Sequence, residues 1–215
     1  MLHLGRILLI ALSGLVCSAA TAQVQFSLTR PNLKVGEVAK YRTIDLSKQT
    51  EISTSERELV QISDEKLVER ETSSVSPSPR DISYNRFWNS CRSLQFSSKE
   101  VCDGALKFPM RVGAKHEIKE HPWSNGQGHS SMKCEVKGEE KLTLASGTFD
   151  TLRIECAGFW TDVIGTPRFA GQQSEIHWYA PAYGRAVRTQ FTSLMSTGLP
   201  DRKTQTELVE LIPAK

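Results

Sequence analysis

The most regular hydrophobic pattern in the chain lies between residues 132 and 160, where apolar and polar positions alternate. In its first half the even positions are mostly apolar and the odd positions are all polar: Met132, Cys134, Val136, Gly138, Glu140, Leu142 and Leu144 against Lys133, Glu135, Lys137, Glu139, Lys141 and Thr143. After the turn sequence ASGTF the apolar even positions return: Leu152, Ile154, Cys156, Gly158 and Trp160. A period of two is typical of a strand with one buried face. The stretch is therefore predicted to be a long antiparallel hairpin with its other face in water.

Shorter segments elsewhere also have the composition of strands. EVAKYRTIDL and RELVQI near the start, and TQTELVELI at the end, are predicted strands. SEIHWYAPAYGRAVRTQF is predicted to be a strand, a turn and a strand, because Pro181 fixes φ in the turn and Gly184 relaxes its exit. The stretch SSVSPSPRD, residues 73–81, is predicted to be a solvated connection, and residues 82–104 fit no regular element.

Residues 56–71 allow two interpretations. Ser55 and Glu58 have the spacing of a capping box, which would start a helix. The apolar positions that follow do not repeat at helical spacing, so we favour a hairpin. Helical signals are few along the whole chain. The predicted fold class is mainly β: a single curved antiparallel sheet or half-barrel with little helix.

The first 22 residues are predicted to be a signal peptide, and residues 23–215 a single β-rich domain. A short segment with Arg6 precedes an apolar run over residues 7–16 and a small-residue site, so cleavage is expected after Ala22. The run is too short to span a bilayer as a helix, and no other segment is a candidate transmembrane span. The predicted location is periplasmic or secreted. Lipid attachment at Cys17 is the less favoured alternative, because Val16 stands where a small residue is usual.

The charge balance of the chain argues against nucleic acid as a partner. Without residues 1–22 the chain carries 26 Lys and Arg residues against 24 Asp and Glu residues, because Arg6 is the one basic residue lost. Nucleic-acid binding calls for a concentrated basic patch, which this balance does not give.

Four cysteines remain after the predicted cleavage: Cys91, Cys102, Cys134 and Cys156. An even count in an exported chain indicates disulfides, and four cysteines allow three pairings. We favour Cys134 with Cys156, which share the apolar face of the hairpin, and Cys91 with Cys102. A symmetrical turn near Gly147 would leave the first pair diagonal, at about 7 to 8 Å, so a bulge near Gly138 is needed. The alternative links a hairpin cysteine to Cys91 or Cys102 across the core.

Four segments together resemble a broad set of exported bacterial β-rich proteins of unknown function: LKVGEVAKYR, FPMRVGAKHE, GEEKLTLASGTFDTLRIEC and HWYAPAYGRAVR. These families share a GtF hairpin followed by a WYxPxxGxV hairpin. The resemblance implies a half-barrel-like sheet, similar in outline to periplasmic lipoprotein carriers. It implies no catalytic residues.

Local motifs give little sign of catalysis. His116, His121 and His129 lie close together in the sequence, but no His-x-x-His spacing accompanies them, so we interpret them, like His177, as histidines in water at loops and strand ends. No G-x-S-x-G motif is present. No catalytic residue, cofactor or metal is predicted.

Aromatic residues suggest a ligand-binding function instead. Most of them are expected in the core, but nine could line an apolar groove: Phe87, Trp88, Trp123, Phe159, Trp160, Trp178, Tyr179, Tyr183 and Phe191. The candidate ligand-binding residues among them are Trp88, Trp160, Trp178 and Tyr183. The predicted function is a non-enzymatic periplasmic domain that binds a lipid, another apolar small molecule or an envelope protein. The alternative is an exported enzyme, such as a hydrolase, since catalytic groups can be assembled in space without a sequence motif.

Overall fold

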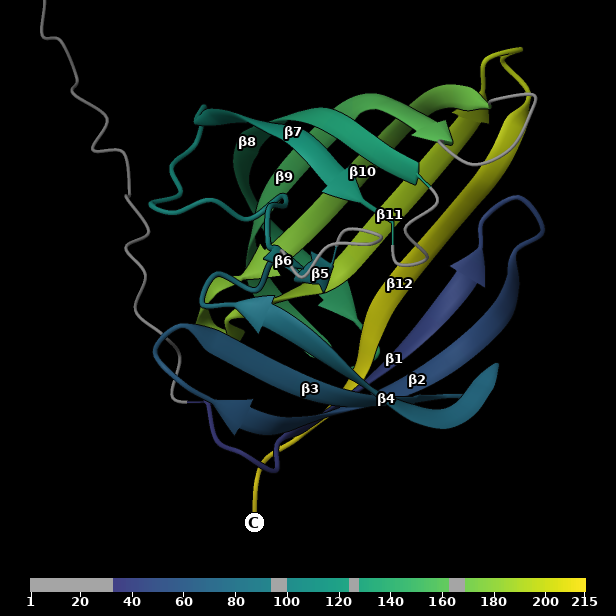
Figure 1. The fold of residues 1–215 in the computed structure, drawn as a ribbon. Helices are drawn as coiled ribbons and strands as arrows, with labels where there is room; N and C mark the ends of the chain where they lie inside the picture. Colours follow the sequence, from purple (N-terminus) through teal and green to yellow (C-terminus); the bar gives the residue numbers. More distant parts are fainter. Residues whose placement is uncertain (1–32, 94–99, 124–127, 163–168) are drawn as a thin grey trace, which may run out of the picture.

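The computed structural model describes residues 33–93, 100–123, 128–162 and 169–215, which are coloured in Figure 1. The predicted fold class is confirmed, because these residues form one curved, open antiparallel sheet of ten strands, a two-stranded ribbon and a single turn of 3-10 helix, η1. The elements are β1 (Val38–Asp45), β2 (Thr50–Ile62), β3 (Lys66–Ser73), β4 (Ser76–Asn85), β5 (Arg92–Ser93), β6 (Glu100–Val101), β7 (Lys115–Pro122), β8 (Gly128–Leu144), β9 (Gly147–Asp162), β10 (Ala170–Ala180), η1 (Pro181–Tyr183), β11 (Arg185–Met195) and β12 (Pro200–Ile212).

The ten-stranded sheet is built from two meanders that meet at the ends of the chain. Its order is β4-β3-β2-β1-β12-β11-β10-β9-β8-β7, so β1 and β12 are neighbours in the middle, and β4 and β7 form the two edges. The sheet curves so that the ribbon of β5 and β6 lies inside it (Figure 1). Within the described ranges, no helix has the length and apolar character needed to cross a membrane. The predicted signal peptide and Cys17 lie outside the described residues.

Two predictions for the first meander have different outcomes. Residues 56–71 form part of the β2–β3 hairpin, as favoured over a helix. The prediction of a solvated connection over residues 73–81 is wrong, because β4 begins at Ser76 and pairs with β3. Prolines argue against a central strand because they lack an N–H. β4 accommodates Pro77 and Pro79 because it is an edge strand, whose one neighbour in the described ten-stranded sheet is β3.

The β8–β9 hairpin is confirmed, and its register resolves the disulfide pairing. Leu144 pairs with Gly147, so the turn consists of Ala145 and Ser146. This turn lies earlier in the chain than the turn centred on Gly147 that a symmetrical hairpin would have. A shift in register between Val136 and Gly138 then brings Cys134 directly opposite Cys156. The two cysteines form a disulfide with their Cα atoms 4.0 Å apart, which is the favoured pairing. The bulge expected near Gly138 therefore occurs at Lys137.

The described residues between β4 and β7, residues 86–93 and 100–114, lie against the inner face of the sheet, and those up to 104 belong to the stretch that the sequence left unassigned. The side chain of Asn89 donates to the carbonyl of Leu106 at 2.6 Å and accepts from its N–H at 3.0 Å. Cys91 and Cys102 close the segment with the second disulfide. Its apolar residues pack against strands β7 to β10 in one buried cluster: Ala105, Leu106, Met110, Ile118, Met132, Cys134, Val136, Leu152, Ile154, Cys156 and Tyr179. The segment thus forms the floor of the space that the sheet encloses.

Candidate functional site

Two adjoining cavities lie inside the curve of the sheet, beside the segment between β4 and β7. Their volumes are about 360 Å³ and about 590 Å³. The first is lined by strands from both meanders, which places it on the concave face. Both volumes fall in the range of about 300–1,000 Å³ that is usual for small-molecule sites. We therefore treat the two cavities as the candidate functional site.

The first cavity has a strongly charged lining. Arg185, at the start of β11, pairs with Glu69 of β3 and with Glu37, which precedes β1. Burial raises the pKa of Tyr84, so its hydroxyl stays protonated. The charged and ring-bearing residues of the lining are Tyr41, Arg57, Glu69, Arg80, Tyr84, Trp88, Arg92, Asp103, His121, Glu175, His177 and Arg185. This composition differs from the apolar groove that the aromatic residues alone suggested.

The second cavity combines an aromatic wall with polar groups. The rings of Trp123 and Trp160 are in contact, with their centroids 5.7 Å apart, and Phe191 adds a third aromatic ring. The indole N–H of Trp160 is buried and has no hydrogen-bond partner among the described residues. Polar residues complete the lining: Arg92, His121, Ser130, Gln173, Glu175, Ser193, Asp201, Arg202 and Thr204.

The two cavities share three residues, Arg92 of β5, His121 of β7 and Glu175 of β10, and we call these the junction residues. The carboxylate of Glu175 lies 2.9 Å from Nε2 of His177. Burial alone would raise the pKa of Glu175, but the hydrogen bond and the positive charges on His177, His121 and Arg92 lower it overall. Glu175 is therefore ionised at neutral pH, and its carboxylate is engaged by His177.

The other two junction residues lack such partners. In the part of the chain that the structure describes, Arg92 has no ion pair, although the charge of Glu175 acts on it. Nδ1 of His121 is buried without a hydrogen-bond partner there, although the imidazole has a hydrogen-bonding contact with the backbone of Asp103. Burial lowers the pKa of His121, and the nearby charge of Arg92 lowers it further. The interpretation of this histidine as a residue in water is therefore wrong.

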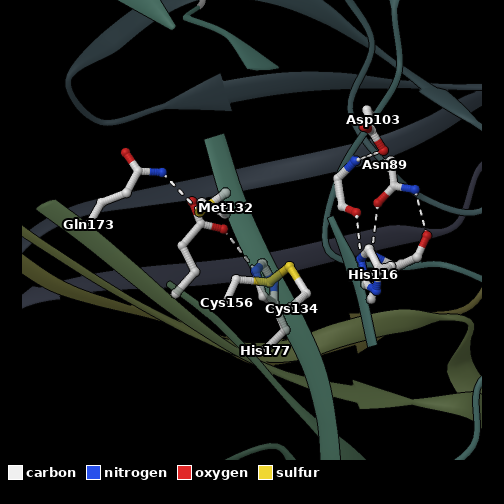
Figure 2. The surroundings of a disulfide bond; sticks show 11 residues. Asn89, Asp103, His116, Met132, Cys134, Cys156, Gln173 and His177 are labelled. Carbon is white, nitrogen blue, oxygen red and sulfur yellow. Dashed lines mark hydrogen bonds and ion pairs between the residues drawn. A yellow bond between two sulfur atoms is a disulfide. The ribbon is translucent and has the colours of Figure 1, made fainter. Parts of the chain in front are cut away.

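The Cys134–Cys156 disulfide supports this wall of the site. Cys156 is paired in the sheet with Glu175, and Met132, two residues before Cys134, lines the first cavity. Figure 2 shows Met132 between the disulfide and Gln173, whose amide donates to the sulfur of Met132. The disulfide therefore ties β8, which carries Met132, to β9, the sheet neighbour of the strand β10 that carries Gln173, Glu175 and His177.

The four aromatic residues that the sequence put forward are divided by the structure. Trp88 lines the first cavity and Trp160 lines the second. Trp178 and Tyr183 lie away from both. Tyr183 is in η1, 38% exposed, and its ring packs against Phe149.

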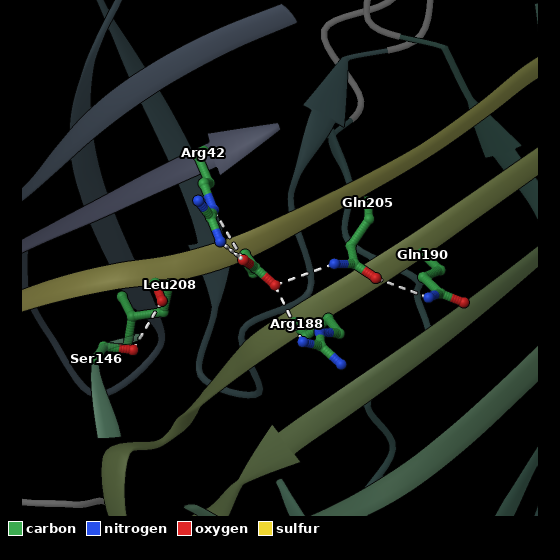
Figure 3. Close-up of polar contacts among 7 residues, drawn as sticks. Arg42, Ser146, Arg188, Gln190, Gln205 and Leu208 are labelled. Carbon is green, nitrogen blue, oxygen red and sulfur yellow. Dashed lines mark hydrogen bonds and ion pairs between the residues drawn. The ribbon is translucent and has the colours of Figure 1, made fainter. Parts of the chain in front are cut away.

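Trp178 belongs to a separate polar network on the sheet. Its indole N–H donates to Glu140 at 3.0 Å, and the guanidinium groups of Arg153 and Arg188 lie over its ring. Arg188 also pairs with Glu207, which accepts from Arg42 as well (Figure 3). The carboxylate of Glu207 is buried and joins β1, β11 and β12. This network fixes the middle of the sheet and contacts neither cavity.

The histidines are not brought together as a metal site. His116 contacts the carbonyl of Gly104 at 3.3 Å, and its pKa is lowered mainly by burial. Among the described residues, the one cluster of three potential ligand atoms is Cys91, Glu100 and Cys102. Both of its sulfurs are in a disulfide and are therefore not available as thiolate ligands.

The junction residues were not identified from the sequence. Arg92, His121 and Glu175 are far apart along the chain, and each lies in a short or polar segment without a motif. The one available signal was that Glu175 and His177 alternate with apolar Ile176 and Trp178, which puts the acid and the imidazole on the same face of a strand. Which face is the inner one depends on the curvature of the sheet.

No protein-family model and no curated protein matches the chain. Solved structures do share its fold. A predicted lipoprotein from Parabacteroides distasonis has a TM-score of 0.51 at 14% identity, over 87% of this chain and 98% of that one. An exported protein with a YmcC-like fold from Bacteroides fragilis has a TM-score of 0.50 at 13% identity, over 87% and 99% of the two chains. These likenesses show the fold alone, which agrees with the half-barrel sheet that the sequence resemblance implied.

Proposed function

We propose that this protein is an exported, non-enzymatic binding protein that holds a small ligand inside the curved sheet. The observation that carries the proposal is the pair of adjoining cavities of about 360 and 590 Å³ on the concave face. Cavities of this size on a rigid β scaffold are typical of sites that take up a small molecule. Two disulfides fit a location outside the cytoplasm, and the predicted signal peptide supports export.

The lining favours an amphiphilic ligand over a purely apolar one. An apolar molecule would leave the charged groups of the first cavity without water or partners, which is unfavourable. A ligand with a polar group and an apolar body could place its polar group near the junction residues and its apolar body against Trp123, Trp160 and Phe191. Of the four candidate ligand-binding residues from the sequence, Trp88 and Trp160 line the cavities.

An enzymatic function has one structural argument in its favour, the Glu175–His177 pair facing the first cavity. Such a pair can accept and return a proton, but covalent hydrolysis also needs a nucleophile within hydrogen-bond reach of the base. Among the described residues, the hydrogen-bond partner of the His177 imidazole is the Glu175 carboxylate. The binding function therefore remains the better supported proposal.

Native mass spectrometry of protein purified from the periplasm tests the proposal. We expect an additional mass of a few hundred daltons at one copy per chain. Thr204 lines the larger cavity and is only partly buried, so Thr204→Trp should fill the space and abolish the added mass. The matched control is Thr54→Trp on the exposed part of β2, which should keep it. Retention of the same mass by Thr204→Trp, or its absence from the unmodified protein, would contradict the proposal.

A further inference from the structure

Two hydrogen-bond donors around the larger cavity have no hydrogen-bond or ion-pair partner among the described residues. They are the half-buried guanidinium of Arg92 and the buried indole N–H of Trp160. Buried polar groups in folded proteins nearly always have a partner, and each exception calls for an explanation. His121 lies beside them: its Nδ1 is buried without a hydrogen-bond partner, while the imidazole has a hydrogen-bonding contact with the backbone of Asp103. The three residues come from β5, β7 and β9 but line one cavity, where an acceptor on a ligand could pair with the two donors.

The nearby acids do not fill this role. Glu175 is the junction carboxylate, but His177 holds it at 2.9 Å. Asp103 lines the first cavity, where its carboxylate accepts from the N–H of Gly104 at 3.1 Å. Asp201 lines the larger cavity from an exposed position at the start of β12. None of the three forms an ion pair with Arg92 in the described ranges, so the guanidinium is free to bind an external group.

We propose that Arg92 and Trp160, with His121 beside them, form a seat for an anionic group, a carboxylate or a phosphate, carried by the ligand. The proposal rests on the binding function proposed above and specifies its ligand class. The guanidinium of Arg92 can donate two parallel hydrogen bonds to such a group, which an ammonium cannot do with the same geometry. The aromatic pair of Trp123 and Trp160 lies beside the seat and offers an apolar surface for the rest of the molecule.

The test uses two fluorescent probes that differ by one anionic group. 1-Anilinonaphthalene-8-sulfonate and N-phenyl-1-naphthylamine have the same ring system, and only the first carries a sulfonate. We expect the purified full chain to bind the sulfonate probe at least about ten-fold more tightly, since hydrogen bonds to charged groups have that magnitude. Octanoate and octyl phosphate should displace the sulfonate probe, whereas octanol should not. The relative potency of octanoate and octyl phosphate shows whether the site prefers a carboxylate or a phosphate.

Variants locate the anion. Arg92→Met should weaken binding of the sulfonate probe about ten-fold to a hundred-fold and leave the neutral probe unchanged. Arg92→Lys should restore part of the loss, and His121→Gln should cause a smaller one. Arg111→Met is the matched control, because Arg111 is exposed and lines neither cavity. Circular dichroism and melting temperatures verify that each variant is folded.

The outcomes separate the two proposals. If neither probe binds the unmodified protein, the binding function itself is wrong, and the anion seat with it. If both probes bind equally well, or if Arg92→Met has no greater effect than Arg111→Met, the cavity binds ligands but the anion seat is wrong. A sulfonate preference that disappears with Arg92→Met and persists in Arg111→Met supports the seat.

Discussion

Replacing Arg185 with Met should destabilise the protein more than replacing any exposed arginine. The side chain of Arg185 is 4% exposed, and its guanidinium pairs with Glu69, which is 3% exposed, and with Glu37, which is 14% exposed. It also lies over the ring of Trp88, 5.0 Å from the centroid. The variant would leave the carboxylates of Glu37 and Glu69 without the guanidinium that pairs with both, although the charge of Arg57 would still act on Glu69.

The expected loss follows from this burial. Removing one partner of a buried ion pair costs about 3–5 kcal/mol, because the remaining charge is left uncompensated. For a domain of this size each kcal/mol lowers the melting temperature by about 2–4 °C. Arg185→Met should therefore melt about 6–20 °C below the unmodified protein, as measured by circular dichroism and by urea unfolding at pH 7.

Two further variants separate charge from packing. Adding Glu69→Gln to Arg185→Met removes the more deeply buried carboxylate, so part of the lost stability should return. Arg111→Met, at an exposed position, should change stability by less than about 0.5 kcal/mol. If Arg185→Met costs no more than this control, or if the double variant is no more stable than the single one, the buried ion pairs do not hold the two meanders together and the argument is wrong.

Three more predictions concern the disulfides, the histidines and export. Peptide mapping without reduction should find Cys134 linked to Cys156 and Cys91 linked to Cys102, and a link between a cysteine of one pair and a cysteine of the other would refute this pairing. Loss of the first disulfide in Cys134→Ala/Cys156→Ala should lower the free energy of unfolding by roughly 3 kcal/mol. Burial lowers the pKa of His116 and His121 in the folded protein. Near pH 6 the unfolded chain therefore binds more protons than the folded chain. The free energy of unfolding should be highest above about pH 6.5 and should fall as the pH drops below that value. His121→Gln should make urea midpoints between pH 7 and pH 5 less dependent on pH, and an equal slope in both proteins would count against the buried imidazole. Intact-mass measurement of the exported protein should give Gln23 as the first residue, whereas a diacylated Cys17 would replace this prediction with a membrane-tethered form.

Local patterns predicted most of the strands because they act over a few residues. The alternation from Met132 to Leu144 and the Pro181–Gly184 turn identify their elements without reference to the rest of the chain. Pro77 and Pro79 misled this reasoning, because whether a proline can lie in a strand depends on whether that strand is at an edge. That position is a property of the whole sheet order and is not encoded locally.

Most strand-forming segments could be assigned from the sequence alone, although β4 was missed, and so could the shared face of Cys134 and Cys156 and the need for a bulge near Gly138 to join them. The sequence also determined the mainly β class, because period-two alternation requires only the geometry of a single strand. The candidate site was decided by the tertiary structure. Arg92, His121 and Glu175 meet only because the sheet curves around the segment between β4 and β7, and that curvature results from the packing of all ten strands.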